Sequence, residues 1–178
     1  FIYSLQTLKQ MMPVDIFSSG GASKARWVLP CCTIIDKPRF AYRGMHLDSS
    51  RHFWTVDQVK KYLDMMAMFK LNRLHWHLTD DQGWRIEIDA YPELVTKGSM
   101  RKETLVGHGL TPEKWDGTPY GGYYTKAEIR DVIAYAEARN IVIIPEIEMP
   151  GHAQAALHAL PWLGCDEQEV EVWTQWGV

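Results

Sequence analysis

The sequence of 178 residues predicts an α/β protein, a partial TIM (β/α)₈ barrel of about the first three βα units, preceded by the end of a small α+β domain. Three apolar segments of strand length alternate with segments of helical period, and each apolar segment ends in polar or charged residues. Apolar parallel strands covered by helices, with functional side chains at their carboxyl ends, are typical of such a barrel. A doubly wound sheet also fits, but no Gly-rich phosphate loop follows any strand. The barrel is therefore favoured.

The predicted strands cover residues 42–47, 73–78 and 141–147. Each is bounded by polar clusters, and the third is nearly continuous in Val and Ile. A long excursion rich in Gly and aromatic residues, 82–124, follows the second strand.

Two helices are predicted from their first turns. Thr55 and Gln58 form a capping box, and Thr125 and Glu128 form a second one. Apolar residues then recur at helical spacing. In the first helix they are Val56, Val59, Leu63, Met66 and Phe69, and in the second Ile129, Val132, Ile133 and Ala136.

The chain divides into two predicted parts. Residues 1–38 form the end of a small domain and a linker, with a helix over 4–12, a Gly-rich loop at Gly20 and Gly21, and a short strand over 31–35. Residues 39–178 form the first part of the barrel. A complete barrel takes about 250 residues, so we expect five further units outside this sequence.

Composition excludes several classes of protein. The chain is 46% hydrophobic and 23% charged with a net charge of -3, which is globular and lacks the basic excess of a nucleic-acid surface. No apolar run is long enough for a membrane span. Three cysteines make no disulfide framework. Eight tryptophans lean weakly towards a carbohydrate ligand, although most tryptophans fill cores.

The second predicted strand carries the densest cluster of polar side chains. His75 and His77 share one face because side chains alternate along a strand. Together with Asp80 they could bind a metal, as in a metal-dependent amidohydrolase. The alternative is that they are hydrogen-bonded histidines inside the barrel.

The third predicted strand ends in a second cluster. Glu146 and Glu148 share a face, and the turn after them can direct His152 over the barrel mouth, where Asp80 could hold it. Buried carboxylates need partners, for which Arg51, Arg85 and His75 are the candidates. His152 is equally consistent with an exposed turn.

Arg51 follows the first predicted strand. A guanidinium at the active face can hold sugar hydroxyls or a carboxylate through its fixed fork of donors. The alternative is an arginine that closes its loop by binding carbonyl groups.

The same three places carry motifs of a known family. The segments YRGMHLDSSRHF (42–53), LNRLHWHLTDDQGWR (71–85) and PEIEMPGH (145–152) resemble the family 20 glycoside hydrolases, the β-N-acetylhexosaminidases. The opening YSLQTL (3–8) is similar to the last helix of the small domain that precedes the barrel in that family. The motifs lie in order and with matching spacing over nearly the whole chain.

The resemblance implies roles for individual residues. Arg51 would bind the sugar hydroxyls at carbons 3 and 4, while Asp80 and His152 would support the general acid. The other residues that could face the active site are Asp81, Glu146, Glu148, His77 and Trp84. No metal or organic cofactor is implied, and the partner is a glycan with a terminal N-acetylhexosamine.

The implied mechanism retains configuration without an enzymic nucleophile, because the substrate's own N-acetyl oxygen attacks carbon 1 and forms an oxazolinium. An adjacent Asp-Glu pair in a G-G-D-E motif orients the acetamide and protonates the leaving oxygen. That motif is absent here, and Asp166-Glu167 follows no apolar strand, so we expect it to be surface. The pair is expected beyond residue 178, and the 178-residue segment alone is expected to be inactive.

Two rivals remain open. One is the metal-dependent hydrolase built on His75, His77 and Asp80. The other is a non-catalytic sugar-binding remnant of the family. The family also implies that the parent protein is exported, to the periplasm, the extracellular space or the lysosome.

Overall fold

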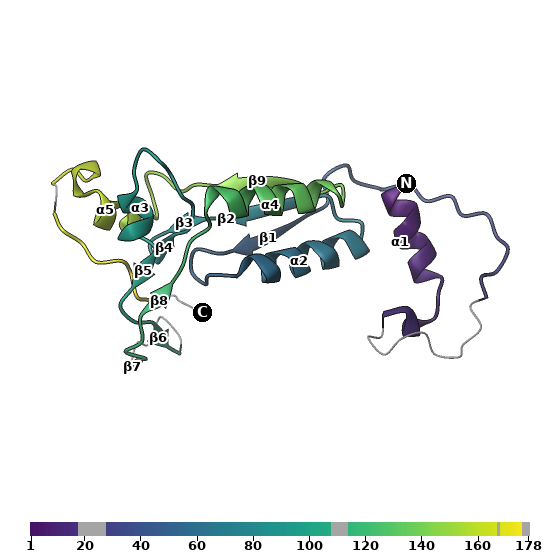
Figure 1. The fold of residues 1–178 in the computed structure, drawn as a ribbon, viewed down its shortest axis with the longest axis horizontal. Helices are drawn as coiled ribbons and strands as arrows, with labels where there is room; N and C mark the ends of the chain where they lie inside the picture. Colours follow the sequence, from purple (N-terminus) through teal and green to yellow (C-terminus); the bar gives the residue numbers. More distant parts are fainter. Residues whose placement is uncertain (18–27, 108–113, 167, 176–178) are drawn as a thin grey trace.

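A three-stranded parallel sheet forms the centre of the computed structural model, which describes residues 1–17, 28–107, 114–166 and 168–175 (Figure 1). The strands are β1 (Gly44–Asp48), β2 (Arg73–His77) and β9 (Val142–Glu146), and they lie side by side in that order. All three predicted strands are therefore confirmed, with ends shifted by one or two residues. The parallel pairing and sequential order are those expected of consecutive βα units.

Both predicted capping boxes are present. Helix α2 (Val56–Met68) begins after Thr55, whose side chain accepts a hydrogen bond from the backbone N–H of Gln58. In turn, the Gln58 side chain accepts a hydrogen bond from the backbone N–H of Thr55. Helix α4 (Lys126–Glu137) begins in the same way. These reciprocal bonds satisfy N–H groups that have no partner within the helix.

The two helices cover one face of the sheet (Figure 1). Leu74 and Trp76 point into this layer from β2, where they meet Val59 and Leu63 of α2 and Val132 of α4. All five side chains are buried. The apolar faces of the two helices and the inward-facing residues of β2 therefore form one hydrophobic core, as the sequence pattern predicts.

The second face of the sheet has a different character. The strand register places His46 beside His75 and Asp48 beside His77 on this face. Its apolar members are not covered in the part of the chain that the structure describes, and Val142 is 52% exposed. The histidines and carboxylates on this face continue along the strands to their carboxyl ends.

The excursion after β2 forms a compact substructure at the carboxyl ends of the strands, together with the segment after β9 (Figure 1). Its elements are short. They are β3 (Thr79–Asp80), β4 (Gly83–Trp84), α3 (Glu93–Thr96), β5 (Met100–Arg101), β6 (Leu105–Val106), β7 (Lys114–Trp115), β8 (Tyr120–Gly121), α5 (Gln154–Ala159) and the 3₁₀ turn η2 (Pro161–Leu163).

Arg85 fixes this substructure to the sheet. Its guanidinium is fully buried and donates to the carbonyl oxygens of Ser49 and Ser50 after β1, and to those of Gln82, Ser99 and Gly122. Burial lowers the pKa of Arg85 to about 10, and the neighbouring charge of Arg101 adds to this effect. Loop closure through carbonyl groups, which the sequence left open as an alternative role for Arg51, is therefore the role of Arg85.

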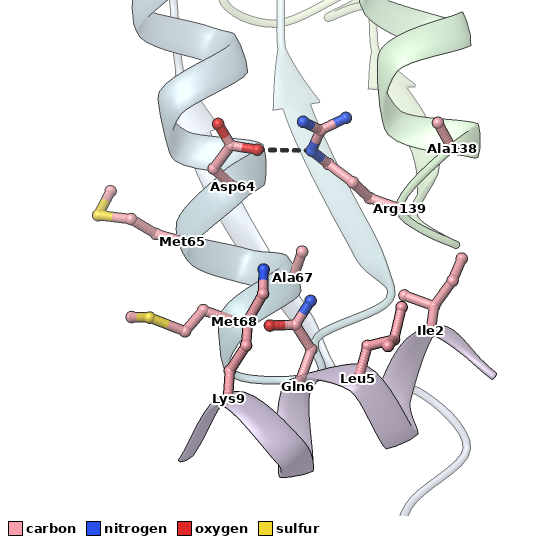
Figure 2. Close-up of a pocket in the computed structure, with 10 residues that line it drawn as sticks. All are labelled: Ile2, Leu5, Gln6, Lys9, Asp64, Met65, Ala67, Met68, Ala138 and Arg139. Carbon is pink, nitrogen blue, oxygen red and sulfur yellow. Dashed lines mark hydrogen bonds and ion pairs between the residues drawn. The ribbon is translucent and has the colours of Figure 1, made fainter. Parts of the chain in front are cut away.

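The N-terminal segment lies at the opposite end of the sheet. Helix α1 (Ile2–Gln10) confirms the predicted helix and is followed by the 3₁₀ turn η1 (Val14–Phe17). Residues of α1, of the second half of α2 and of the end of α4 line a groove of about 620 Å³. Leu5 of α1 points into this groove (Figure 2). An ion pair between Asp64 Oδ1 and Arg139 Nε, 2.6 Å long, joins α2 to the end of α4 beside this groove (Figure 2).

The short strand predicted over residues 31–35 is wrong. This segment is irregular and exposed, because no strand in the described residues lies beside it to pair with its backbone. The predicted loop at Gly20 and Gly21 lies outside the described residues. Among the helices that the structure describes, none is long and apolar enough to cross a membrane.

Candidate functional site

Charged side chains converge where β1, β2 and β9 end. Arg51, His77, Asp80 and Glu146 come from four separate segments and form one connected network of hydrogen bonds and ion pairs. The sequence-predicted residues Asp81, Glu148 and His152 lie at its edge. The carboxyl ends of parallel strands are where active sites of α/β folds are built.

The turn after β1 directs Arg51 into this network. Asp48 Oδ1 accepts hydrogen bonds from the backbone N–H groups of Ser50 and Arg51, each 3.0 Å long, and so closes an Asx-type turn. Asp48 Oδ2 also binds Arg51 Nη1 at 2.9 Å. The other guanidinium nitrogen, Nη2, then lies 2.7 Å from Asp80 Oδ2. Arg51 therefore uses its fork on two carboxylates rather than on the loop carbonyls.

Asp80 is the most buried acid of the network, with 1% of its surface exposed. Its Oδ2 atom meets Arg51 Nη2 and His77 Nε2, and its Oδ1 atom accepts the backbone N–H of Asp81 at 2.7 Å. Burial opposes ionisation, but the hydrogen bonds from His77 and the Asp81 backbone and the charge of Arg51 outweigh it, so the pKa of Asp80 is lowered. Asp80 is thus held as an anion and is a poor proton donor.

His77 stands between two acids. Its Nε2 atom lies 2.8 Å from Asp80 Oδ2 and its Nδ1 atom lies 2.7 Å from Glu146 Oε2. Burial disfavours a charged ring, yet the hydrogen bonds to Asp80 and Glu146 raise the pKa of His77 overall. Burial likewise works against the charge of Glu146, but His77 and His75 lower the pKa of Glu146. Of the predicted partners for Glu146, the structure supplies His75, at 2.6 Å, and neither Arg51 nor Arg85.

His152 lies at the exposed edge of the site. Its Nδ1 atom is 3.3 Å from Asp81 Oδ2 and 3.4 Å from Asp80 Oδ1, and its side chain is 55% exposed. Its backbone has a left-handed φ of 51°, two residues after the cis Met149-Pro150 bond. His152 therefore contacts both Asp80 and Asp81. Asp81 also accepts a hydrogen bond from the backbone N–H of Gln154 at the start of α5.

The structure does not bring Trp84 into this network. The indole is buried in a second core formed with α3 and α5, and its Nε1 atom donates to the carbonyl oxygen of Ile86 at 2.7 Å. Glu148 is closer to the network: a carboxylate oxygen of Glu148 lies within 4.8 Å of ligand atoms of both His77 and Glu146. Asp166 is exposed, as expected for a surface loop, whereas Glu167 lies outside the described residues.

Three groups of side chains in the described residues have the composition of a metal site: His46 with His75 and Glu146, His77 with Glu146 and Glu148, and Asp80 with Asp81 and His152. The predicted set of His75, His77 and Asp80 is not among them. Because both ring nitrogens of His77 face carboxylates, His77 would have to give up one of these bonds to bind a cation. The observed geometry is that of a hydrogen-bonded network.

One part of the site was not expected from sequence. His46 packs edge-on against His75, with ring centroids 4.6 Å apart, and His46 Nε2 lies 3.8 Å from Glu146 Oε2. The signal was available in the alternation of strand residues, but only the pairing register of β1 with β2 brings the two rings together.

Comparisons with known proteins agree with one another. The glycosyl hydrolase family 20 catalytic-domain model matches residues 40–178. A beta-hexosaminidase of Porphyromonas gingivalis is 49% identical over 99% of this chain. Among solved structures, the GH20 beta-N-acetylhexosaminidase from Streptomyces coelicolor A3(2) has 41% identity and a TM-score of 0.85 over 98% of this chain. A mutant Streptomyces plicatus beta-hexosaminidase in complex with product (GlcNAc) has 43% identity and the same TM-score over the same share.

The chain is much shorter than these relatives. It spans 21% of the Porphyromonas gingivalis protein, 33% of the Streptomyces coelicolor chain and 32% of the Streptomyces plicatus chain.

Proposed function

This chain belongs to glycosyl hydrolase family 20, and from that premise we propose that the protein containing it removes terminal, β-linked N-acetylglucosamine or N-acetylgalactosamine from the non-reducing ends of glycans. The names of the relatives support this substrate class, and the Streptomyces plicatus structure holds GlcNAc as product. We further propose that the three-stranded sheet is the beginning of a (β/α)₈ barrel and that residues 1–38 end a separate small domain.

The Arg51–Asp80 ion pair is the observation that carries the proposal. A guanidinium held by two carboxylates at the carboxyl end of a sheet keeps a fixed orientation, which suits it to the paired hydroxyl groups of one sugar. Because Asp48 and Asp80 hold Arg51 in place before a ligand arrives, little side-chain entropy remains to be lost on binding.

We propose a substrate-assisted, retaining reaction. The acetamide oxygen attacks carbon 1, the bond to the leaving oxygen breaks as that oxygen is protonated, and water then opens the oxazolinium ion. The proton requires a carboxylic acid that is still protonated near neutral pH. An anionic Asp80 beside such an acid raises its pKa, and His152 at the edge of the site would hold it in position.

The acid itself is not assigned to any residue of this chain. No Gly-Gly-Asp-Glu motif occurs in residues 1–178. We therefore propose that residues 1–178 supply binding and supporting groups, and that this stretch alone is inactive. Turnover of an aryl N-acetyl-β-glucosaminide by the purified stretch, above the rate of an Asp80→Asn preparation, would contradict that part of the proposal.

The stereochemistry of the reaction tests the mechanism. The full-length protein is mixed with an aryl N-acetyl-β-glucosaminide, and the first-formed sugar is followed by proton NMR. The proposal expects the β-anomer first. An α-anomer formed first would exclude the oxazolinium route, and binding of N-acetylglucosamine without any hydrolysis would favour a sugar-binding remnant.

A further inference from the structure

His77 has a carboxylate oxygen at each of its two ring nitrogens. Glu146 Oε2 lies 2.7 Å from Nδ1, and Asp80 Oδ2 lies 2.8 Å from Nε2, while only 4% of the residue is exposed. An ionised carboxylate accepts hydrogen bonds and cannot donate one. If both acids are ionised, both ring nitrogens carry protons and His77 is an imidazolium ion.

The surroundings of Glu146 favour its ionised form. The same oxygen, Oε2, also lies 2.6 Å from Nε2 of His75. Two imidazole rings that converge on one oxygen are best satisfied when that oxygen accepts from both. A proton on Oε2 would leave the oxygen one lone pair to share between two close nitrogens.

The charged and titratable groups near His77 come from the four strands β1, β2, β3 and β9, the loop after β1 and the turn after β9. They are His46, Asp48, Arg51, His75, Asp80, Glu146 and Glu148. Carboxylates outnumber the cation Arg51 among them. Arg51 Nη1 lies 3.5 Å from His77 Nε2, and Asp80 Oδ2 accepts from both side chains and so compensates their like charges.

We propose that Glu146 is a positioning residue, which keeps His77 protonated and thereby fixes the orientation and negative charge of Asp80. This inference rests on the proposed function, because Asp80 is the group through which the effect reaches the reaction. Glu146 is half-buried beneath the site and need not touch the sugar itself.

The contacts from Glu146 through His77 to Asp80 predict a specific change in how kcat depends on pH. Without the charge of Glu146, His77 loses its second proton at a lower pH. A neutral His77 can still donate one hydrogen bond to Asp80, but it no longer places a positive charge beside that carboxylate. Asp80 then interacts less strongly with Arg51 and with the proposed general acid, which is not assigned to any residue of this chain. A residue that only supported the fold would change the amount of folded protein and leave the pH profile in place.

The test is Glu146→Gln in the full-length protein, with Glu137→Gln on the exposed side of α4 as the matched control. We expect Glu146→Gln to lower kcat by roughly tenfold to a hundredfold, by analogy with the loss caused by removing the hydrogen-bond partner of a metal-binding histidine. The alkaline limb of the kcat profile should move to lower pH by about one unit, with KM nearly unchanged. Glu137→Gln should change neither. A wild-type kcat, or a loss of kcat with the limb unmoved, would overturn the inference.

A second readout does not need activity. In protein with isotope-labelled histidine, NMR reports how many protons the His77 ring carries, and the His77→Gln variant identifies its signals. We expect both nitrogens to be protonated at neutral pH in the wild type, and His77 to titrate at lower pH in Glu146→Gln. A neutral His77 ring in the wild type would overturn the inference even if Glu146→Gln failed to fold. An inactive wild type with a protonated His77 would instead count against the proposed function alone.

Discussion

Arg51 Nη2 lies 2.7 Å from Asp80 Oδ2, and this contact joins the turn after β1 to the first residues after β2. The two side chains are brought together by the parallel register, in which Asp48 lies beside His77 at the last position of each strand. The acid is buried and the guanidinium is only partly exposed, so the pair has a fixed geometry rather than the variable one of a surface ion pair.

Replacing Arg51 by lysine should impair sugar binding. Lysine keeps the positive charge but cannot bridge Asp48 and Asp80 with two nitrogens while presenting further donors to a ligand. We expect kcat/KM for an aryl N-acetyl-β-glucosaminide to fall by roughly a hundredfold in the full-length protein. The exposed Arg130→Lys on α4 serves as the control and should behave as wild type. An Arg51→Lys protein with normal kcat/KM would remove Arg51 from the binding site.

Asp80→Asn should destabilise the fold. The amide leaves the buried His77 and the Arg51 guanidinium without their shared negative partner, a loss of about 3 kcal/mol or more in the free energy of unfolding. Asp131→Asn offers a matched comparison, because it breaks an exposed ion pair with Lys60 and should cost less than about 1 kcal/mol. Urea unfolding of both variants measures the difference, and equal losses would contradict the buried network.

The free energy of unfolding should decrease both at acid pH and at alkaline pH. The folded-state pKa of Asp80 is below 3.8, so its contribution is present above pH 3.8 and is lost as the pH falls through the lowered value. The folded-state pKa of His77 is above 6.5, so its contribution is complete below pH 6.5 and is lost as the pH rises through the raised value. Unfolding in urea from acid to alkaline pH should show both declines. In His77→Gln the alkaline decline should be smaller, and an unchanged alkaline decline would contradict the assignment.

Arg85→Lys should loosen the substructure at the carboxyl ends of the strands. A lysine has one nitrogen in place of the three with which Arg85 reaches carbonyl groups from four segments. With several buried carbonyls left without donors, we expect a loss of about 3 kcal/mol or more in the free energy of unfolding. Hydrogen exchange should rise in residues 99–101 and 120–122 before it rises in the sheet. Uniform exchange throughout would show that Arg85 does not join these parts.

Most of the fold followed from local sequence patterns. The capping boxes at Thr55 and Thr125 mark where α2 and α4 begin, because the chemistry of a cap lies within four consecutive residues. The apolar runs of the three strands were equally clear. The failed strand over residues 31–35 had the right composition, but a strand also needs a neighbour to pair with its backbone, and composition carries no information about that neighbour.

The site was less predictable than the fold. The sequence predicts Arg51, Asp80 and Glu146 as site residues, with Arg51, Arg85 and His75 as the candidate partners of the carboxylates. The structure pairs Glu146 with one of these candidates, His75, and also with His77, since the register of β2 with β9 places His77 directly beside Glu146. Partners across strands depend on register, which a single sequence does not specify. Trp84 lies in a core for a similar reason, because α5 packs against it from far along the chain.

The most direct test of the account compares two substrates in the full-length protein: an aryl N-acetyl-β-glucosaminide and the aryl β-glucoside that lacks the 2-acetamido group. If the acetamide is the nucleophile, the first is hydrolysed and kcat/KM for the second is lower by at least about a thousandfold. Similar values of kcat/KM for the two substrates, or hydrolysis of the glucoside alone, would contradict the proposed activity.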